Sequence, residues 1–176
     1  GTIERIAMVL FFGMGNASSV MIGNRIGAGE EDKAYEYGKR FLTLGPLFGI
    51  LMGLILILSR GFLLTFFNIS PEVNLAAQRI LLIFALLMPI RIIYMIIIIG
   101  VLRSGGDTRY SLFLDTVGVW AIGIPLAFIG GILMGLPVYW VYLLVSAEEI
   151  FKIIFGLRRF ITEKWINNLV QASESV

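Results

Sequence analysis

Long apolar blocks, separated by short polar stretches, restrict the folds open to this sequence more than any other feature. Apolar residues make up 58% of the 176-residue chain, against about 45–50% in a typical soluble domain. They gather in blocks close to the roughly 20 residues that a helix needs to cross a bilayer. Strands of a membrane β-barrel alternate polar and apolar residues, whereas residues 96–99 are all isoleucine. The sequence therefore predicts an all-α integral membrane protein.

Polar breaks divide the chain into five predicted membrane-spanning helices and a tail. A charged segment fills the first break, and turns rich in Gly and Pro fill the shorter ones. These breaks place the helix boundaries because charged and turn-forming residues end apolar helices. The predicted spans are residues 3–24, 41–59, 73–102, 108–134 and 138–160, and the tail is residues 161–176.

Glycines in the second span predict a close contact between two helices. Gly45, Gly49 and Gly53 recur every four residues, so they share one helix face. Small residues at that spacing let a neighbouring helix backbone approach closely.

Two residues near the last helices predict local structure at the membrane boundary. Asp107 precedes the fourth span and is expected to cap it. Trp165 follows Lys164 at the start of the tail, and both residue types are common at the membrane interface.

Basic residues predict the orientation of the chain in a cell membrane. With five spans, nine basic residues fall on one side and three on the other. Cytoplasmic loops carry the excess of Lys and Arg, so the C-terminus is expected in the cytoplasm. An external beginning and an odd number of spans fit a C-terminal part of a longer transporter. The nine are Arg25, Lys33, Lys39, Arg40, Arg103, Arg109, Arg158, Arg159 and Lys164.

Three segments carry a resemblance to a known family. Residues 17–40 read ASSVMIGNRIGAGEEDKAYEYGKR, with a GAG turn followed by a charged segment. Residues 100–128 read GVLRSGGDTRYSLFLDTVGVWAIGIPLAF, and residues 148–170 read EEIFKIIFGLRRFITEKWINNLV. Together they resemble the multidrug and toxic compound extrusion (MATE) family, and the second segment is the most specific of the three.

The resemblance implies a fold and an activity. Members of that family have twelve spans in two six-helix lobes, and they export cationic drugs in exchange for Na⁺ or H⁺. The five predicted spans correspond to helices eight to twelve, most of the C-terminal lobe. The expected partners are small-molecule substrates, the lipid bilayer and an N-terminal lobe of the same protein, with no nucleic acid. Na⁺ or H⁺ is the expected coupling ion, without a further cofactor.

One position departs from the family pattern. Some branches carry an acidic residue near the proline of the tenth helix, where it binds a cation. Here the matching stretch is Pro89-Ile90-Arg91, which holds no carboxylate. A Na⁺ site of that type is therefore not expected in this chain.

Charged residues inside the predicted spans need a physical explanation. A charge near the bilayer centre costs about 2.5–3.5 kcal/mol on insertion scales. One explanation for Arg91, Glu148 and Glu149 is a water-filled cavity that binds a substrate or coupling cation. The other is structural: Arg91 pairs with one glutamate, and Glu148 pairs with Lys152 one turn later. For Arg91 the structural explanation is favoured, because a fixed positive charge repels a cationic substrate.

The site candidates follow from these alternatives. Glu148 and Glu149 are neighbours on a helix and point about 100° apart, so one can pair while the other attracts a coupling ion or substrate. Asn16 is a candidate to line a polar cavity, and the ring of Tyr94 is a candidate to stack on a cation. Structural charge partners are Arg91, Lys152 and Asp115, with Arg103 or Arg109 opposite Asp115.

Residue types that are missing narrow the function further. The chain has no cysteine and no histidine, so it lacks a thiol nucleophile and the commonest general base. Two adjacent carboxylates on one helix cannot converge into a catalytic dyad, and neither an enzyme nor a metal site is expected. The remaining alternatives are a multidrug antiporter, a lipid-linked oligosaccharide flippase of the same superfamily, and a non-transporting membrane subunit.

Overall fold

A computed structural model describes residues 2–67 and 69–167, and among these residues it shows helices, turns and one isolated β-bridge. The all-α prediction is confirmed for this part of the chain. Within it, the helices join end to end into five rods. The first two rods are α1 (Thr2–Gly27) and α2 (Glu31–Thr65), and α3 (Pro71–Met95) continues as the π-helix η1 (Ile96–Arg103). The fourth rod joins α4 (Thr108–Val117), the π-helix η2 (Gly118–Gly123), α5 (Ile124–Phe128) and the π-helix η3 (Ile129–Leu133), and the fifth joins α6 (Val138–Val145) and α7 (Ala147–Ile161).

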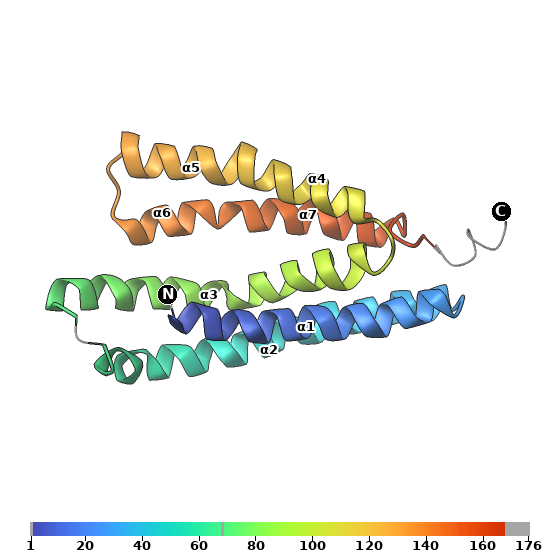
Figure 1. The fold of residues 1–176 in the computed structure, drawn as a ribbon, viewed down its shortest axis with the longest axis horizontal. Helices are drawn as coiled ribbons and strands as arrows, with labels where there is room; N and C mark the ends of the chain where they lie inside the picture. The colour runs from blue at the N-terminus through green and yellow to red at the C-terminus, as the bar shows by residue number, and fades with distance from the viewer. Residues whose placement is uncertain (1, 68, 168–176) are drawn as a thin grey trace.

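The rods form two groups that meet along α3 and η1. Figure 1 shows α1, α2 and α3 packed together, with the hairpin of α4–α5 and α6–α7 beside them. The helix of the hairpin that meets the other group is α7, which contacts α3 and η1; inside the hairpin it contacts η2. The α1–α2 turn, the η1–α4 turn and the end of α7 gather at one end of the molecule (Figure 1).

Three of the rods are long and apolar enough to cross a membrane. They are Glu31–Thr65, Pro71–Arg103 and Thr108–Leu133, with 35, 33 and 26 residues. Even 26 residues reach about 39 Å at 1.5 Å per residue, which exceeds the roughly 30 Å of hydrocarbon. This confirms the membrane character of the fold.

Two of the five predicted spans stay predictions. The span at residues 3–24 falls within α1, several of whose first side chains lie outside the described set. The span at residues 138–160 is divided at Ser146 into α6 and α7, which have 8 and 15 residues.

The glycines of α2 form the predicted close-packing face. A Cβ atom added to Gly49 would lie 2.6 Å from the Cα of Pro89, and one on Gly53 would lie 2.5 Å from the carbonyl oxygen of Ala85. Both neighbours are backbone atoms, which cannot turn aside. Gly45 faces the side chains of Ile92 and Ile96, which occupy the space that a Cβ atom would need. The prediction for this face is confirmed, and α2 lies against α3 because these positions lack side chains.

We expect Gly49→Ala to destabilise the protein by about 1–3 kcal/mol, the usual cost of overpacking. Gly61→Ala, on the same helix, is the matched control, because no described heavy atom lies within 4 Å of the added Cβ. That control should be neutral or stabilising, since alanine favours helix over glycine by about 1 kcal/mol. Thermal unfolding in detergent measures both changes, and equal shifts would contradict the close contact.

Trp165, at the start of the predicted tail, is fully buried within the described chain. Its place at the membrane interface stays a prediction. The indole packs against Gly105, and its Nε1–H donates to the carbonyl oxygen of Phe160 at 3.2 Å. The backbone N–H of Asn167 donates to Gly105 at 2.8 Å, so residues 162–167 dock on the η1–α4 turn. The rest of the predicted tail, residues 168–176, lies outside the described residues.

Asp107 differs from its prediction. It occupies the N-cap position of α4, but its carboxylate makes no capping hydrogen bond within the described chain. Instead it accepts a hydrogen bond from Nε of Arg159 at 2.6 Å. The guanidinium gives this carboxylate a charge-assisted hydrogen bond and an opposite charge. Asp107 therefore joins the start of α4 to the end of α7.

Candidate functional site

Six charged side chains meet between α3, η1, α4 and α7. We call this set the charge network; it holds three carboxylates and three cationic groups, so its formal charges balance. Ion pairs join its members in two sets: Arg91 with Glu149 at 3.3 Å, and Arg103, Asp115, Lys152 and Glu148 at 3.2 to 3.6 Å, and the two sets adjoin at the neighbouring residues Glu148 and Glu149. The network lies along the surface where the α4–α7 hairpin meets the rest of the bundle. Its members are Arg91, Arg103, Asp115, Glu148, Glu149 and Lys152.

Arg91 and Glu149 form the most enclosed pair between α3 and α7. The distance from Arg91 Nε to Glu149 Oε1 is 3.3 Å, and the two side chains are 12% and 14% exposed. The guanidinium carbon also lies 4.8 Å from the ring centre of Phe84 and 5.4 Å from that of Tyr142. Aromatic faces stabilise a cation, so Arg91 is held by charge and by stacking.

The Arg91–Glu149 pair retains hydrogen-bonding capacity. Arg91 Nε and Glu149 Oε2 are buried and make no hydrogen bond within the described residues. A buried polar atom in that state costs free energy. Glu149 Oε2 can therefore bind a proton, accept a hydrogen bond from a water molecule or bind a small cation.

Lys152 is the most deeply buried member of the network, at 4% exposed. Its Nζ lies 3.4 Å from Glu148 Oε1 and 3.6 Å from Asp115 Oδ1. The ring centre of Tyr94 lies 5.2 Å from the same ammonium. Tyr94 in turn donates its hydroxyl hydrogen to Asp115 Oδ1 at 2.8 Å. Asp115 is thus a shared acceptor, and its second oxygen lies 3.2 Å from Nη2 of Arg103.

Two glycines of η2 make room for this buried lysine and its partner. A Cβ atom on Gly118 would crowd the Lys152 stem, 3.2 Å from its Cγ and 3.3 Å from its Cδ. One on Gly123 would lie 2.7 Å from Glu148 Oε2. The two positions lie in a π-helix, a conformation that is rare and frequent at functional sites. The backbone of η2 therefore forms the wall against which Lys152 and Glu148 are buried.

Most of the sequence-predicted candidates meet in the network. Glu148 and Glu149 diverge on α7, and each has a different cationic partner. Tyr94 joins through Asp115, which pairs with Arg103 rather than Arg109. Asn16 does not join them, because it lies on the exposed side of α1. The coupling role of Glu148, Glu149, Asn16 and Tyr94 stays a prediction.

Sequence reasoning did not single out Gly118 and Gly123. Their five-residue spacing could have indicated that they share a helix face, because a π-helix has more residues in each turn than an α-helix and brings positions five residues apart to one side. No metal-binding group of three or more acidic, His or Cys side chains occurs among the described residues.

A family comparison covers most of the chain that builds this arrangement. The MatE family model matches residues 2–129, which include α1 to α3, η1, α4, η2 and Asp115. The chain belongs to the MatE family. The match takes in the GAG turn and the 100–128 segment, so the sequence-based assignment is confirmed.

Curated relatives extend the likeness beyond the matched segment. An uncharacterized transporter, YisQ of Bacillus subtilis (strain 168), is 27% identical over 160 residues, which cover 90% of this MatE chain and 35% of YisQ. The probable multidrug resistance protein NorM of Brucella suis is 28% identical over 128 residues, covering 70% of this chain and 27% of NorM. The multidrug resistance protein MdtK of Yersinia enterocolitica is 28% identical over 123 residues, covering 70% and 26%.

This MatE chain spans about a quarter to a third of the length of the curated relatives that it matches. Comparison with solved structures found no match.

We expect Lys152→Met to destabilise the protein by about 3–5 kcal/mol, because it leaves the largely enclosed carboxylate of Glu148 without its cation and removes one of the two cations of Asp115. Adding Glu148→Gln should recover part of that loss. Lys33→Met is the control: Lys33 Nζ pairs with Glu30 Oε1 at 2.7 Å on the exposed surface, where an ion pair contributes little. Chemical unfolding in detergent measures all three variants. A Lys152→Met variant as stable as the control would show that the network does not support the fold.

Proposed function

We propose that this chain is part of a cation-coupled multidrug efflux antiporter in a cell membrane. The antiporter exports amphipathic, cationic compounds in exchange for Na⁺ or H⁺. Membership of the MatE family and the likeness to the multidrug resistance proteins NorM and MdtK support the transport class. The observation that carries the cation coupling is the buried charge network between α3, η1, α4 and α7.

The coupling step is expected at Glu148 and Glu149. A charge in a spanning helix costs several kcal/mol unless it is compensated. A proton or Na⁺ that neutralises Glu149 would release Arg91 from its partner on α7. The attraction between α3 and α7 then depends on whether the coupling cation is bound. A ligand with different affinity for two helix arrangements shifts their populations, as alternating access requires.

The remaining network members position these two carboxylates. Lys152 and Asp115 hold Glu148 between α7 and α4, since both carboxylates share the one ammonium. Tyr94 fixes the Asp115 carboxylate through its hydroxyl hydrogen bond. We propose that Asn16, on the exposed side of α1, faces a space between this lobe and a second lobe of the same protein.

The second lobe and the membrane orientation belong to the same proposal. Transporters of this architecture place their sites between two related lobes, and this chain supplies helices of the C-terminal one. The excess of basic residues at the end shared by the α1–α2 turn and the end of α7 supports a cytoplasmic location for that end. The proposed activity is transport, and no reaction is catalysed.

The flippase alternative is less well supported. A protein that binds a phosphorylated lipid carrier is expected to have a basic central cavity. Here the central arginine, Arg91, is paired with Glu149, and the formal charges of the network balance. That balance favours an exporter of cations.

We expect the Glu148→Gln/Glu149→Gln double variant to lose most ion-coupled efflux. Two neutral amides would remove the groups that bind the coupling cation. The Glu31→Gln/Glu36→Gln double variant removes the same charge from exposed positions of α2 and is expected to keep normal efflux. Ethidium efflux from cells that express the gene product with both lobes, with and without a Na⁺ gradient and a pH gradient, measures the difference. Unchanged efflux in the first variant, at equal expression, refutes coupling at these residues.

A further inference from the structure

Both rods of the C-terminal hairpin have an interruption in their regular α-helix. In the fourth rod, the π-helix η2 ends at Gly123, and Pro125 follows in α5. In the fifth rod, α6 and α7 meet at Ser146, whose ψ of −11° departs from the roughly −42° of an α-helix. Each rod is thus divided into an inner part, α4–η2 or α7, and an outer part.

Each interruption has a local cause that permits bending. Pro125 has no N–H and cannot donate the hydrogen bond of a regular helix. Sharp bends in helices occur mostly at prolines, at Gly and Ser, and at π-helical turns. Ser146 Oγ donates to the carbonyl oxygen of Tyr142 at 2.9 Å, and a serine that bonds four residues back often bends its helix.

Contacts between η2 and α7 place the two interruptions side by side. A Cβ atom on Gly118 would lie 3.2 Å from Cγ of Lys152, and one on Gly123 would lie 2.7 Å from Oε2 of Glu148. The two rods are antiparallel (Figure 1), so these contacts set one register along them. Continuing that register past Gly123 brings the start of α5 opposite Ser146. The outer part of the hairpin, residues 124–145, therefore begins at the same level in both rods; we call it the arm.

The arm holds together as a unit. The backbone N–H of Leu136 donates to the carbonyl oxygen of Gly130 at 2.9 Å, which closes its turn. A Cβ atom on Gly130 would lie 2.9 Å from Cδ1 of Leu144, so η3 and α6 pack closely. Figure 1 shows α5 and α6 alongside each other, at the end of the hairpin opposite the η1–α4 turn.

Few buried side chains attach the arm to the rest of the bundle. The structure describes every residue of the arm, and among them Gly130 alone is buried. Toward α3, Arg79 Nη1 donates to the hydroxyl of Tyr139 at 2.8 Å on the exposed surface. The guanidinium carbon of Arg91 lies 5.4 Å from the ring centre of Tyr142. A region with few buried apolar contacts opens at a low cost in free energy.

The inner part of the hairpin is fixed by buried aromatic contacts, which we call the clamp. The Phe160 ring of α7 stacks on Tyr35 of α2, with ring centres 4.7 Å apart. A Cβ atom on Gly38 would lie 2.6 Å from Cε2 of the same ring. Phe160 also stacks on the fully buried Trp165 at 5.6 Å. The clamp joins the end of α7 to the start of α2.

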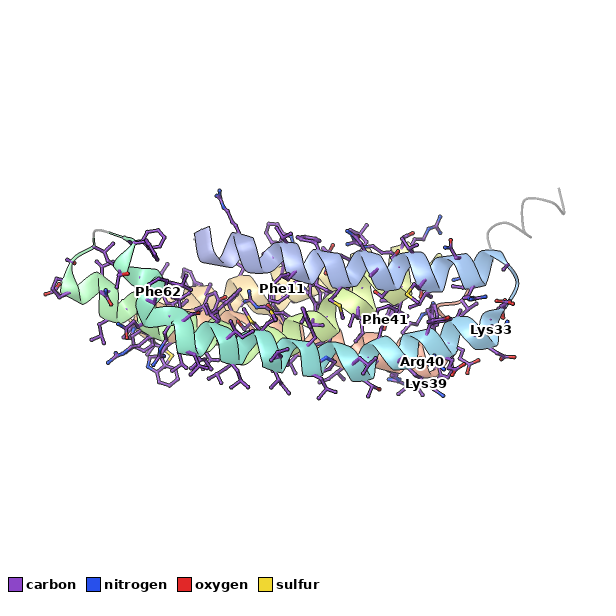
Figure 2. All side chains as sticks on the ribbon, turned by 90° about the horizontal axis from the view of Figure 1, so that it is seen from below. Phe11, Lys33, Lys39, Arg40, Phe41 and Phe62 are labelled. Carbon is purple, nitrogen blue, oxygen red and sulfur yellow. The ribbon has the colours of Figure 1, made fainter. Side chains whose placement is uncertain are left out.

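The clamp and the arm lie at opposite ends of the bundle. Figure 2 shows Lys33 and Lys39 at one end of α2 and Phe62 at the other. The clamp contacts α2 between those two lysines. The arm contacts α3 through Arg79, near the start of α3, which follows the Phe62 end of α2 along the chain. A hairpin that is fixed at one end and weakly attached at the other can open only at the weak end.

We propose that the arm is a hinged element that swings away from α3, with its pivot at η2 and Ser146. Hinge movements concentrate at a few residues at the ends of elements, as these are. Arg91 spans the pivot, because it contacts Tyr142 of the arm and Glu149 of α7. When the arm swings out, Arg91 leaves Tyr142 and keeps Glu149, and Arg79 loses its hydrogen bond to the arm.

The arm does not depend on the proposed transport function, because it rests on packing within one lobe. A rigid hairpin would leave cation coupling at Glu148 and Glu149 open. A protein without efflux would leave the movement of the arm intact.

Electron paramagnetic resonance distances between spin-labelled cysteines test the movement. The chain has no cysteine of its own, and any cysteine elsewhere in the gene product with both lobes is replaced by serine. In lipid nanodiscs, Ile132→Cys/Leu58→Cys measures the arm against α2, and Ile154→Cys/Leu44→Cys measures the clamped part against α2. All four side chains are exposed, and both pairs lie in one lobe, so movement between lobes changes neither distance. We expect the first distance distribution to be at least about twofold wider, because only the arm pivots.

A second comparison relates the movement to the contact with α3. Arg79→Gln/Tyr139→Phe removes the exposed hydrogen bond and should shift the arm pair to longer distances, with the clamped pair unchanged. Arg109→Gln removes a positive charge from an exposed position of α4 and should change neither pair. The thermal midpoint verifies that each variant is folded. Equal widths in the two parent pairs, or an arm distance that ignores the loss of the Arg79–Tyr139 contact, would overturn the hinged arm.

Discussion

The arrangement of the C-terminal hairpin depends on the burial of Lys152 between two carboxylates. Its ammonium lies 3.4 Å from Glu148 and 3.6 Å from Asp115, with the Tyr94 ring beside it. An unpaired charge in that position would be strongly unfavourable, so α7 must lie where α4 can supply the second carboxylate. The Arg91–Glu149 pair sets the same requirement toward α3. Electrostatics thereby determines which helices α7 contacts, a choice that apolar surfaces alone leave open inside a lipid bilayer.

Glycines, which have no side chain, allow close contacts in two parts of the fold. Gly49 and Gly53 bring the backbones of α2 and α3 together, and they face Pro89 and Ala85. In η2, glycines leave space for charged side chains instead of a neighbouring backbone. The first use produces a rigid contact between apolar helices. The second leaves room for the charged side chains of Lys152 and Glu148 against the backbone of η2.

Charge has a different role at the end of the bundle than in its interior. Inside, every carboxylate of the network has a cationic partner, so the network is sensitive to any ion that neutralises one member. At the surface, Lys39 lacks an acidic partner within the described chain, and Tyr35 holds its ammonium in place. The interior charges are thus compensated within the chain, whereas the ammonium of Lys39 is held by a ring and by no carboxylate of the described residues.

Sequence alone determined the helical membrane fold, the glycine face of α2 and the family, because each depends on residues close together along the chain. It also identified Arg91, Glu148, Glu149 and Lys152, since a charge in an apolar run is conspicuous. It did not determine that Glu149 pairs with Arg91 while Glu148 shares Lys152 with Asp115, nor that Arg159 takes Asp107 from its capping role. Those pairings join residues up to 58 positions apart (149 − 91). Only tertiary structure decided them, because the rotation of each helix about its axis is set by packing between rods, and no local pattern reports that rotation.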